Sequence, residues 1–575
     1  MRRIVCLFFT ILLLLPAGCA KLTIHLPAEM RGVKGAGEDV PTSYEAFYHY
    51  LMARAKVKAG DLDDAIEEYH RAITLDARSP LLYVELASLY LNKGWTDKVM
   101  AACRKALVLN PDYLPAHYLL GGVYSTMGRH QEAMEEYQRV LEIDPSHLQA
   151  YLMISTLYAE KKEYERAVDT LEQLLEREPT YLMGLYYLAR IYAEMKLYDK
   201  ALEYYQKVHR LSPNFEAAFM DMGTIYELKG DKERATEMYQ KVLALSPLNF
   251  QARDRLGQLL IKEDRLQEAL DQYNILKDLD SENLSIRVKM GLILFQQEKY
   301  EEAAREFRFV VAARPQNSDV RYYLGMTLHQ MGDSQGALTE LMQISPEGRL
   351  FSEATRYMAY MLQKEGRAKE AITIVEKAIE AKPGDLKLHL TLAFLLEDLA
   401  QYPEAVETLQ QVLSKEPDNT EALFRLGIVH DKMGDTDKTI LYMKRVVEID
   451  PKNADALNYL GYTYAEKGIM LDEAEGLTKR ALELKPEDGY ITDSLGWVYY
   501  QKGDYVKAVQ WLEKAHRMVP EDPIITEHLG DGYRKLDRRK EALRMYQRAL
   551  ELRPKKEREI LLRKKIEELK GGQGS

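Results

Sequence analysis

Apolar residues recur through most of this chain at spacings of three and four, the pattern of a helix with one buried face. In one representative stretch, Leu120 and Tyr124 share a helix face, and Ala133 and Tyr137 share a face of a second helix. Gly128 lies between the two stretches and interrupts the pattern. The pattern therefore predicts pairs of amphipathic helices that are joined by short turns.

The helix pairs repeat with a period of 34 residues, which is marked by prolines after the second helix of each pair. Proline ends a helix because it lacks the amide N–H and clashes with the preceding turn. A fixed period in this range indicates a solenoid of stacked repeats. Ser281 and Arg349 stand where prolines are expected, and one residue is gained before Pro486. The prolines in the series are Pro111, Pro145, Pro179, Pro213, Pro247, Pro315, Pro383, Pro417, Pro451, Pro486, Pro520 and Pro554.

Fifteen units can be placed on this period. In each unit, helix A covers roughly the first 14 positions and helix B covers roughly positions 17 to 31. We therefore predict an all-α superhelical solenoid of about fifteen helix-turn-helix repeats. The units begin at residues 46, 80, 114, 148, 182, 216, 250, 284, 318, 352, 386, 420, 454, 489 and 523.

Small residues occupy fixed positions in both helices. The eighth position of helix A is glycine or alanine in most units, as in Gly121 and Ala189, and helix B carries an alanine such as Ala133. Such residues let the two helices approach closely, and tyrosines such as Tyr124 gather at the eleventh position. In these positions the chain resembles the tetratricopeptide repeat (TPR) family over residues 46–556. The resemblance implies a solenoid that binds proteins in a concave groove.

Three irregularities subdivide the expected solenoid. Helix B of the unit at 318 is predicted to stop early at Ser345, and we expect a bend or hinge at 345–352, with tolerated loop variation as the alternative. The expected bend divides the repeats into an N-terminal array, 46–349, and a C-terminal array, 350–556. An extra residue within 468–472 lengthens one turn. Residues 557–575 are predicted to form a polar-backed capping helix and tail, with an apolar stripe of Ile560, Leu561, Leu562, Ile566 and Leu569.

The N-terminus has the pattern of an export signal. Arg2 and Arg3 precede an apolar run that is shorter than a membrane-spanning helix needs. Residues 1–18 with Cys19 resemble a bacterial lipoprotein signal, which implies lipidation (palmitate) of Cys19 and a flexible tether over 19–45. We expect a lipid-anchored protein of the bacterial envelope, in the outer membrane facing the periplasm. The alternative is an ordinary signal peptide or a short membrane anchor with an incidental cysteine.

Composition and charge exclude several function classes. The formal net charge of −11 argues against nucleic acid, because phosphate binding needs a basic surface. The sequence contains no phosphate-binding glycine loop, HExxH, paired CxxC or GxSxG motif. We therefore expect no enzyme activity, no cofactor or metal and no small-molecule substrate. Cys103 is predicted to be a small buried side chain.

The resemblance implies where a partner protein would bind. In the TPR fold the second, fifth, ninth and twelfth positions of helix A line the concave side. The predicted groove residues are Met183, Tyr186, Met220, Tyr322, Met326, Tyr360, Phe394, Phe424, Ile428, Tyr462, Tyr490, Trp497 and Tyr500. Charged neighbours expected to set specificity are Arg190, Asp254, Arg356, Asp431, Asp493 and Arg534. The alternative is that some of these side chains pack within the superhelix.

The predicted function is that of a non-enzymatic scaffold or adaptor that holds protein segments near the envelope. Parts of the chain are similar to outer-membrane TPR lipoproteins that bring a carboxyl-terminal processing protease to cell-wall hydrolases. The partners implied are an envelope protease, a hydrolase or a secretion component. The alternative function is a structural component of an exopolysaccharide-export, secretion or pilus-assembly machine.

Overall fold

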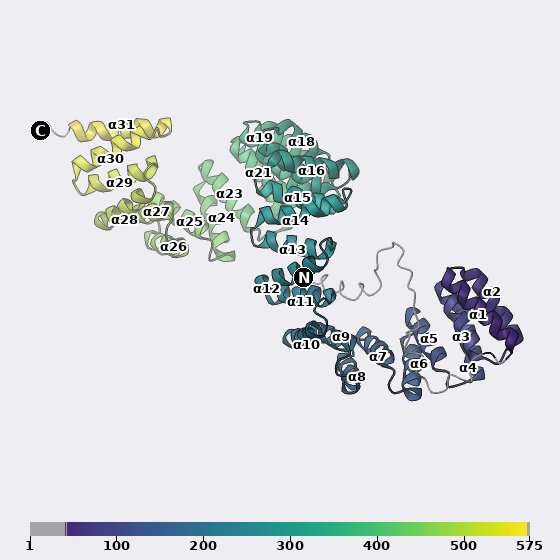
Figure 1. The fold of residues 1–575 in the computed structure, drawn as a ribbon. Coiled ribbons are helices and arrows are strands. Elements are labelled where there is room, and N and C mark those ends of the chain that lie inside the picture. The colour runs from purple at the N-terminus through teal and green to yellow at the C-terminus, as the bar shows by residue number, and fades with distance from the viewer. Residues whose placement is uncertain (1–40, 42, 572–575) are drawn as a thin grey trace. The chain divides into compact units, whose positions relative to one another are not determined.

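The computed structural model describes residue 41 and residues 43–571. Throughout this part of the chain, helices are joined by short turns and no strand occurs (Figure 1). The first thirty of its 31 helices form fifteen consecutive pairs, which confirms the predicted repeats. The predictions for residues 1–40 lie outside the described residues. None of the described helices is both long enough and apolar enough to cross a membrane.

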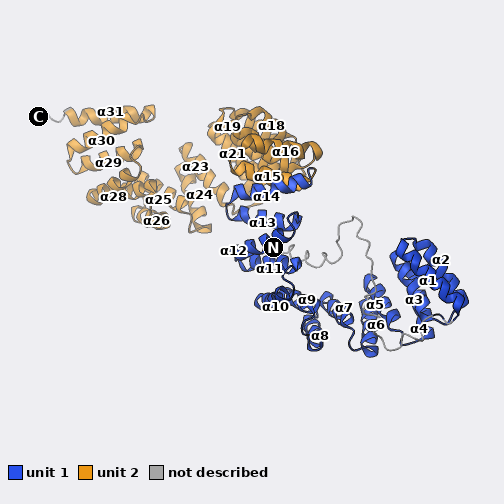
Figure 2. Ribbon diagram, in the orientation of Figure 1, with its two compact units in different colours: residues 1–281 blue, residues 282–575 orange. Residues whose placement is uncertain are grey.

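The chain divides into two compact units, residues 1–281 and residues 282–575 (Figure 2). The predicted boundary at 349/350 therefore falls inside the second unit, and the division instead follows Ser281, where the series of prolines first lapses. Residues 345–352 do not separate two units because the short helix α18 (Ser334–Met342) still packs against both of its neighbours, α17 and α19. Whether this segment acts as a hinge stays a prediction.

Unit 1 contains seven helix pairs. Each helix A packs on the helix B that follows it, and each helix B packs on the next helix A. The helices are α1 (Tyr44–Ala59), α2 (Leu62–Leu75), α3 (Pro80–Asn92), α4 (Thr96–Leu109), α5 (Leu114–Thr126), α6 (His130–Ile143), α7 (Leu148–Glu160), α8 (Tyr164–Arg177), α9 (Leu182–Glu194), α10 (Tyr198–Leu211), α11 (Glu216–Lys229), α12 (Lys232–Leu245), α13 (Phe250–Lys262) and α14 (Leu266–Leu279).

Unit 2 contains eight pairs and a terminal helix, α31. Its helices are α15 (Leu284–Gln296), α16 (Tyr300–Ala313), α17 (Ser318–Gln330), α18, α19 (Phe351–Lys364), α20 (Ala368–Ala381), α21 (Leu386–Asp398), α22 (Tyr402–Lys415), α23 (Thr420–Lys432), α24 (Thr436–Ile449), α25 (Ala454–Lys467), α26 (Leu471–Leu484), α27 (Gly489–Gln501), α28 (Tyr505–Met518), α29 (Pro523–Lys535), α30 (Arg539–Glu551) and α31 (Lys556–Gly571).

Local side-chain chemistry sets the helix ends. Asn249 precedes α13, and its side-chain oxygen accepts a hydrogen bond from the amide of Ala252 at 2.9 Å. This satisfies an amide that has no partner within the helix. Between helix A and helix B the chain passes through a left-handed residue, which is glycine in turns such as that of Gly434 (φ 81°). Ala400 takes the same conformation with φ 58°, although its Cβ makes that conformation costly.

The small residue at the eighth position of helix A permits close packing on helix B, as predicted. A Cβ added to Gly121 would lie 2.7 Å from the ring of Tyr137. Tyr124 is buried at the eleventh position, and Ala133 is fully buried on helix B. Cys103 is also buried and unbonded, and burial raises the pKa of its thiol to about 12. Packing therefore accounts for these positions.

The predicted irregularities appear at the expected places. Helix α18 has nine residues and ends at Met342, and Met470 adopts a left-handed conformation (φ 47°) before α26. The terminal helix α31 buries Leu562 and Ile566 against the preceding repeat. Ile560 and Leu561, the other two residues at the start of the predicted apolar stripe, are exposed. They lie on faces of α31 that no described helix covers.

Candidate protein-binding groove

The thirteen predicted groove residues lie on A helices, and none of them is fully buried. Tyr490 is 57% exposed, Tyr360 is 51% exposed and Phe394 is 39% exposed. The other ten are half-buried, including Met326 and Ile428. Large apolar side chains at these positions are therefore accessible in both units, although to different degrees.

An aromatic cluster forms in the C-terminal repeats. The rings of Trp497 and Tyr500 stack with centroids 4.6 Å apart, and Trp497 also stacks on His528 at 4.1 Å. Tyr462 approaches the same histidine at 6.4 Å. Burial raises the pKa of Tyr500 to about 12, so its hydroxyl stays protonated at neutral pH. The structure thus brings three predicted residues together around a histidine that the sequence did not single out.

Asp493 does not set specificity at the surface, which corrects one of the charged-neighbour predictions. Its side chain is buried, and its Oδ2 lies 2.8 Å from Nδ1 of the buried His528. Arg534 is engaged as well, because it donates to Glu568 of α31 at 2.9 Å. Arg356, by contrast, is exposed. Burial of Asp493 results from the packing of α27 against α29.

Two further aromatic groups occur earlier in unit 2. Tyr357 lies between two predicted residues, with ring centroids 6.2 Å from Tyr322 and 6.5 Å from Tyr360. The guanidinium of Arg425 lies 4.9 Å from the ring of Phe394. A cation over an aromatic face is attracted by the ring quadrupole, so it holds this exposed ring in place.

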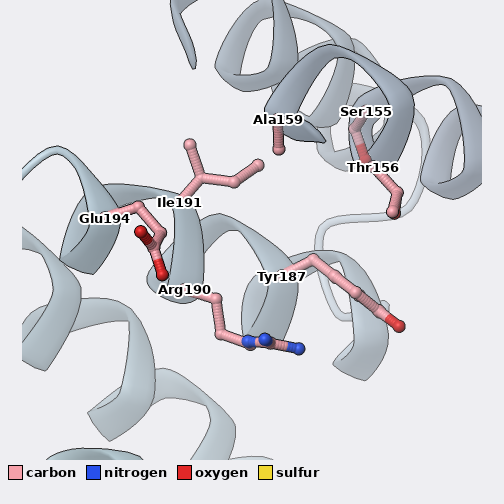
Figure 3. A pocket seen from close by; sticks show the side chains of 7 residues that line it. All are labelled: Ser155, Thr156, Ala159, Tyr187, Arg190, Ile191 and Glu194. Carbon is pink, nitrogen blue, oxygen red and sulfur yellow. The ribbon is translucent and has the colours of Figure 1, made fainter. Parts of the chain in front are cut away.

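In unit 1, Tyr186 contacts Phe215 with ring centroids 5.1 Å apart, and Met183 and Met220 are half-buried on α9 and α11. Residues of α7 and α9 line an open hollow of about 30 Å³ (Figure 3). The hollow is lined by Ser155, Thr156, Ala159, Tyr187, Arg190, Ile191 and Glu194.

Several residues of these surfaces could not be found from the four groove positions alone. His528 and Tyr357 occupy the sixth position of helix A, and Glu194 occupies the thirteenth. Arg425 also stands at a sixth position. Each of these residues stands at a fixed position of the repeat, so a search of every position of helix A would find it. Its aromatic or charged partners, however, come from neighbouring repeats.

Within residues 43–571, no group of three or more His, Cys, Asp or Glu side chains is placed to hold a metal ion. Some buried ionisable groups have partners within the protein. Asp221, for example, accepts a hydrogen bond from Tyr205 at 2.9 Å, and burial raises the pKa of its carboxyl. The accessible features of the A helices are therefore aromatic, apolar and singly charged side chains, which suit contacts with another protein.

Family models for the tetratricopeptide repeat match segments along almost the whole described chain. The matched residues are 53–94, 81–113, 126–185, 183–215, 220–283, 294–359, 362–426, 420–453, 442–476, 471–523 and 526–560. The chain belongs to the tetratricopeptide-repeat family. TPR proteins are in general non-catalytic scaffolds for protein–protein interaction. A search of curated proteins found no significant match.

Solved TPR structures cover parts or most of this TPR chain. MamA is 26% identical over 28% of this chain and 95% of its own, with a TM-score of 0.27. YrrB, a TPR protein with an unusual peptide-binding site, is 22% identical over 32% of this chain and 95% of its own, with a TM-score of 0.28. Yeast Tom70 is 15% identical over 92% of this chain and 96% of its own, with a TM-score of 0.32. Because all three scores are below 0.5, no function is transferred from these structures.

Proposed function

We propose that this TPR protein is a non-enzymatic scaffold that is anchored in the bacterial envelope through a lipid on Cys19. It binds segments of partner proteins along the concave positions of its A helices. The observation that carries the proposal is the exposure of Tyr360, Phe394 and Tyr490 at three of these positions. Exposed aromatic side chains bury a large area on binding at low entropic cost, which is why interfaces use them.

A second part of the proposal concerns the partner proteins and the location of this protein in the cell. We propose an adaptor that brings a periplasmic protease to its substrates, with the body of the protein facing the periplasm. The support for the location is the N-terminal sequence, in which a short apolar run ends at Ala17, Gly18 and Cys19. The support for an adaptor is the series of separate aromatic surfaces, because two partners can occupy different repeats of one solenoid.

Photocrosslinking in cells tests this function. A photoreactive amino acid is placed at position 360, 394 or 490, and in a control at position 441, where Leu441 is 61% exposed but lies on helix B of its repeat. We expect crosslinked proteins from the three A-helix positions and none of them from position 441. Mass spectrometry should identify a protease and a hydrolase among them. Recovery of polymer-export or pilus components would instead favour a structural role, and equal crosslinking at 441 would contradict groove binding.

A further inference from the structure

Each repeat after the first uses one face of its helix A to pack on the preceding repeat. The third and tenth positions are buried in every one of these repeats. A Cβ on Gly184, at a third position, would lie 2.6 Å from Cδ2 of Leu174 on α8. A Cβ on Gly532, at a tenth position, would lie 2.9 Å from Cγ2 of Val509 on α28. Both positions therefore face helix B of the repeat before.

Helix α1 has the same face, but no described helix covers it. It is the first helix of unit 1 and packs on α2 (Figure 2). Its third and tenth positions hold Tyr48, which is 54% exposed, and Ala55, which is also exposed. Tyr44, which is 86% exposed, and the exposed Leu51 continue this stripe at helical spacing. The outer face of a terminal repeat is ordinarily polar, so this apolar end indicates a surface that another protein helix covers.

The other end of the chain is closed by a helix of its own. Helix α31 follows the last pair, buries Leu562 and Ile566, and places Nζ of Lys565 2.7 Å from a carboxylate oxygen of Asp531. It thus takes the place of a following helix A. In the described part of the chain, nothing takes the corresponding place of a preceding helix B at α1.

The residues before α1 are poorly suited to cover this face. A preceding repeat would supply a helix B of 14 residues, the length of α2 and α4. Residues 20–40 contain Pro27, Gly32, Gly35 and Gly37, and proline and glycine both disfavour a helix. Residues 1–18 have the pattern of an export signal, which is removed from the mature chain. A helix of another chain is therefore the better cover.

The charge pattern of α1 complements itself in an antiparallel pair. The first turn carries Glu45, and the last turn carries Lys56 and Lys58, so each acidic end meets the basic end of the other copy. Tyr44 and Lys58 both lie seven residues from Leu51, or about 10.5 Å along the axis. With a two-fold axis at Leu51, the ammonium of Lys58 in one copy lies opposite the ring of Tyr44 in the other. A cation is attracted to the face of such a ring.

We propose that α1 is a dimerisation surface on which the same helix of a second copy packs in the antiparallel orientation. Tyr44, Tyr48 and Leu51 form the centre of the contact. A two-fold contact of this kind is closed, so it gives a dimer and not a polymer. The proposal goes beyond the proposed function, because it concerns association of the chain with itself through a face outside the groove positions.

Disulfide crosslinking of the full chain tests the inference. Helices that pack about 9 Å apart bring facing Cα atoms to about 5 Å, which a disulfide can span. Leu51→Cys should therefore give a disulfide-linked dimer on mild oxidation. A mixture of the single variants Tyr44→Cys and Lys58→Cys should link these two positions to each other. The matched control is Val108→Cys, at an 80% exposed position of α4, which should give only the background of the native cysteines.

A second measurement does not depend on cysteine chemistry. Sedimentation velocity of the wild type should show an equilibrium between monomer and dimer. Tyr48→Glu should raise the dissociation constant about tenfold or more, because the dimer would bury a carboxylate without a partner. Leu441→Glu changes an apolar side chain of similar exposure on α24 and should leave the dissociation constant unchanged. Amide hydrogen exchange of peptides from α1 to α4 checks that Tyr48→Glu retains its fold.

Four results would overturn the inference. Equal crosslinking at positions 51 and 108 would mean that α1 has no specific partner in a second copy. Crosslinks between Leu51→Cys and Ile560→Cys would mean that copies stack head to tail through α31. A monomer in which the thiol of Leu51→Cys reacts slowly with a thiol reagent would mean that residues 1–40 cover the face. A monomer in which only lipid vesicles protect that thiol would assign the face to a membrane surface.

Discussion

Replacing Gly291 by alanine tests the close helix contact on which every repeat depends. A Cβ at this position would lie 2.5 Å from Cε1 of Phe307, whereas ordinary contacts are 3.4–4 Å. Phe307 is fully buried, so its ring cannot move aside without displacing its neighbours. Overpacking of this kind costs about 1–3 kcal/mol. Alanine regains about 1 kcal/mol of helix propensity over glycine, so we expect a net loss of about 1 kcal/mol.

A second substitution should relieve the clash. At the equivalent positions two repeats later, the chain has Ala359 and Val375, which are both buried. Phe307→Val alone removes buried atoms and should cost about 2 kcal/mol. Combined with Gly291→Ala, it restores a pair that this protein already uses. The double variant should therefore be more stable than the sum of the single effects by about 1 kcal/mol.

The assay must be local, because a long repeat array does not unfold as one cooperative unit. Amide hydrogen exchange of peptides from α15 and α16 reports the opening free energy of this repeat. Peptides from α27 and α28 serve as the internal control and should not change. Strictly additive effects of the two substitutions would refute the reasoning, as would greater protection in Gly291→Ala alone.

Other predictions use the charges, the turns and the N-terminus. Lys479 and Lys502 lower the pKa of Glu475 to about 2, below the usual 4.5. A lowered pKa stabilises the fold above about pH 4.5 and ceases to do so as the pH falls towards 2. Glu475→Gln should thus lower the opening free energy of its repeat by about 1 kcal/mol at pH 7, once solvent screening is allowed for, and should not change it at pH 2. Amide hydrogen exchange of peptides from α26 measures this free energy at both pH values. Ala400→Gly should stabilise its repeat by about 0.5–1 kcal/mol in the same assay, because φ is 58° there; a loss would contradict this. Palmitate labelling should mark the wild type and not Cys19→Ala, and equal labelling would exclude this anchor.

The repeat itself could be predicted from sequence because local sterics dictate it. Proline after helix B, glycine in the turn and a small residue opposite Phe307 or Tyr137 each follow from contacts within one unit. The observed bounds of α5 and α6, Leu114–Thr126 and His130–Ile143, accordingly agree with the predicted unit. Segments whose role depends on neighbouring repeats were less predictable, and the boundary expected at 349/350 falls inside a compact unit.

The predicted groove residues lie on A helices and none of them is fully buried, but their environments could not be read from the period. Asp493 is buried by His528, which lies 35 residues away in sequence. Spacing within one repeat specifies the helix face on which a side chain lies. The residue that it contacts depends on the side chains that the adjacent repeat places opposite it.

Within each repeat, some residues are needed for helix packing and others are available for binding. Substitution of the second group tests function without changing the fold. Gly291 and Phe307 are constrained by each other, so a change at either alters stability first. Tyr360, Phe394 and Tyr490 are instead exposed, and exposed aromatic side chains increase the risk of aggregation. Their presence on the A helices is therefore better explained by a ligand than by the fold. Trp497 differs, because its ring is enclosed between Tyr500 and His528, and its replacement would change packing and binding together.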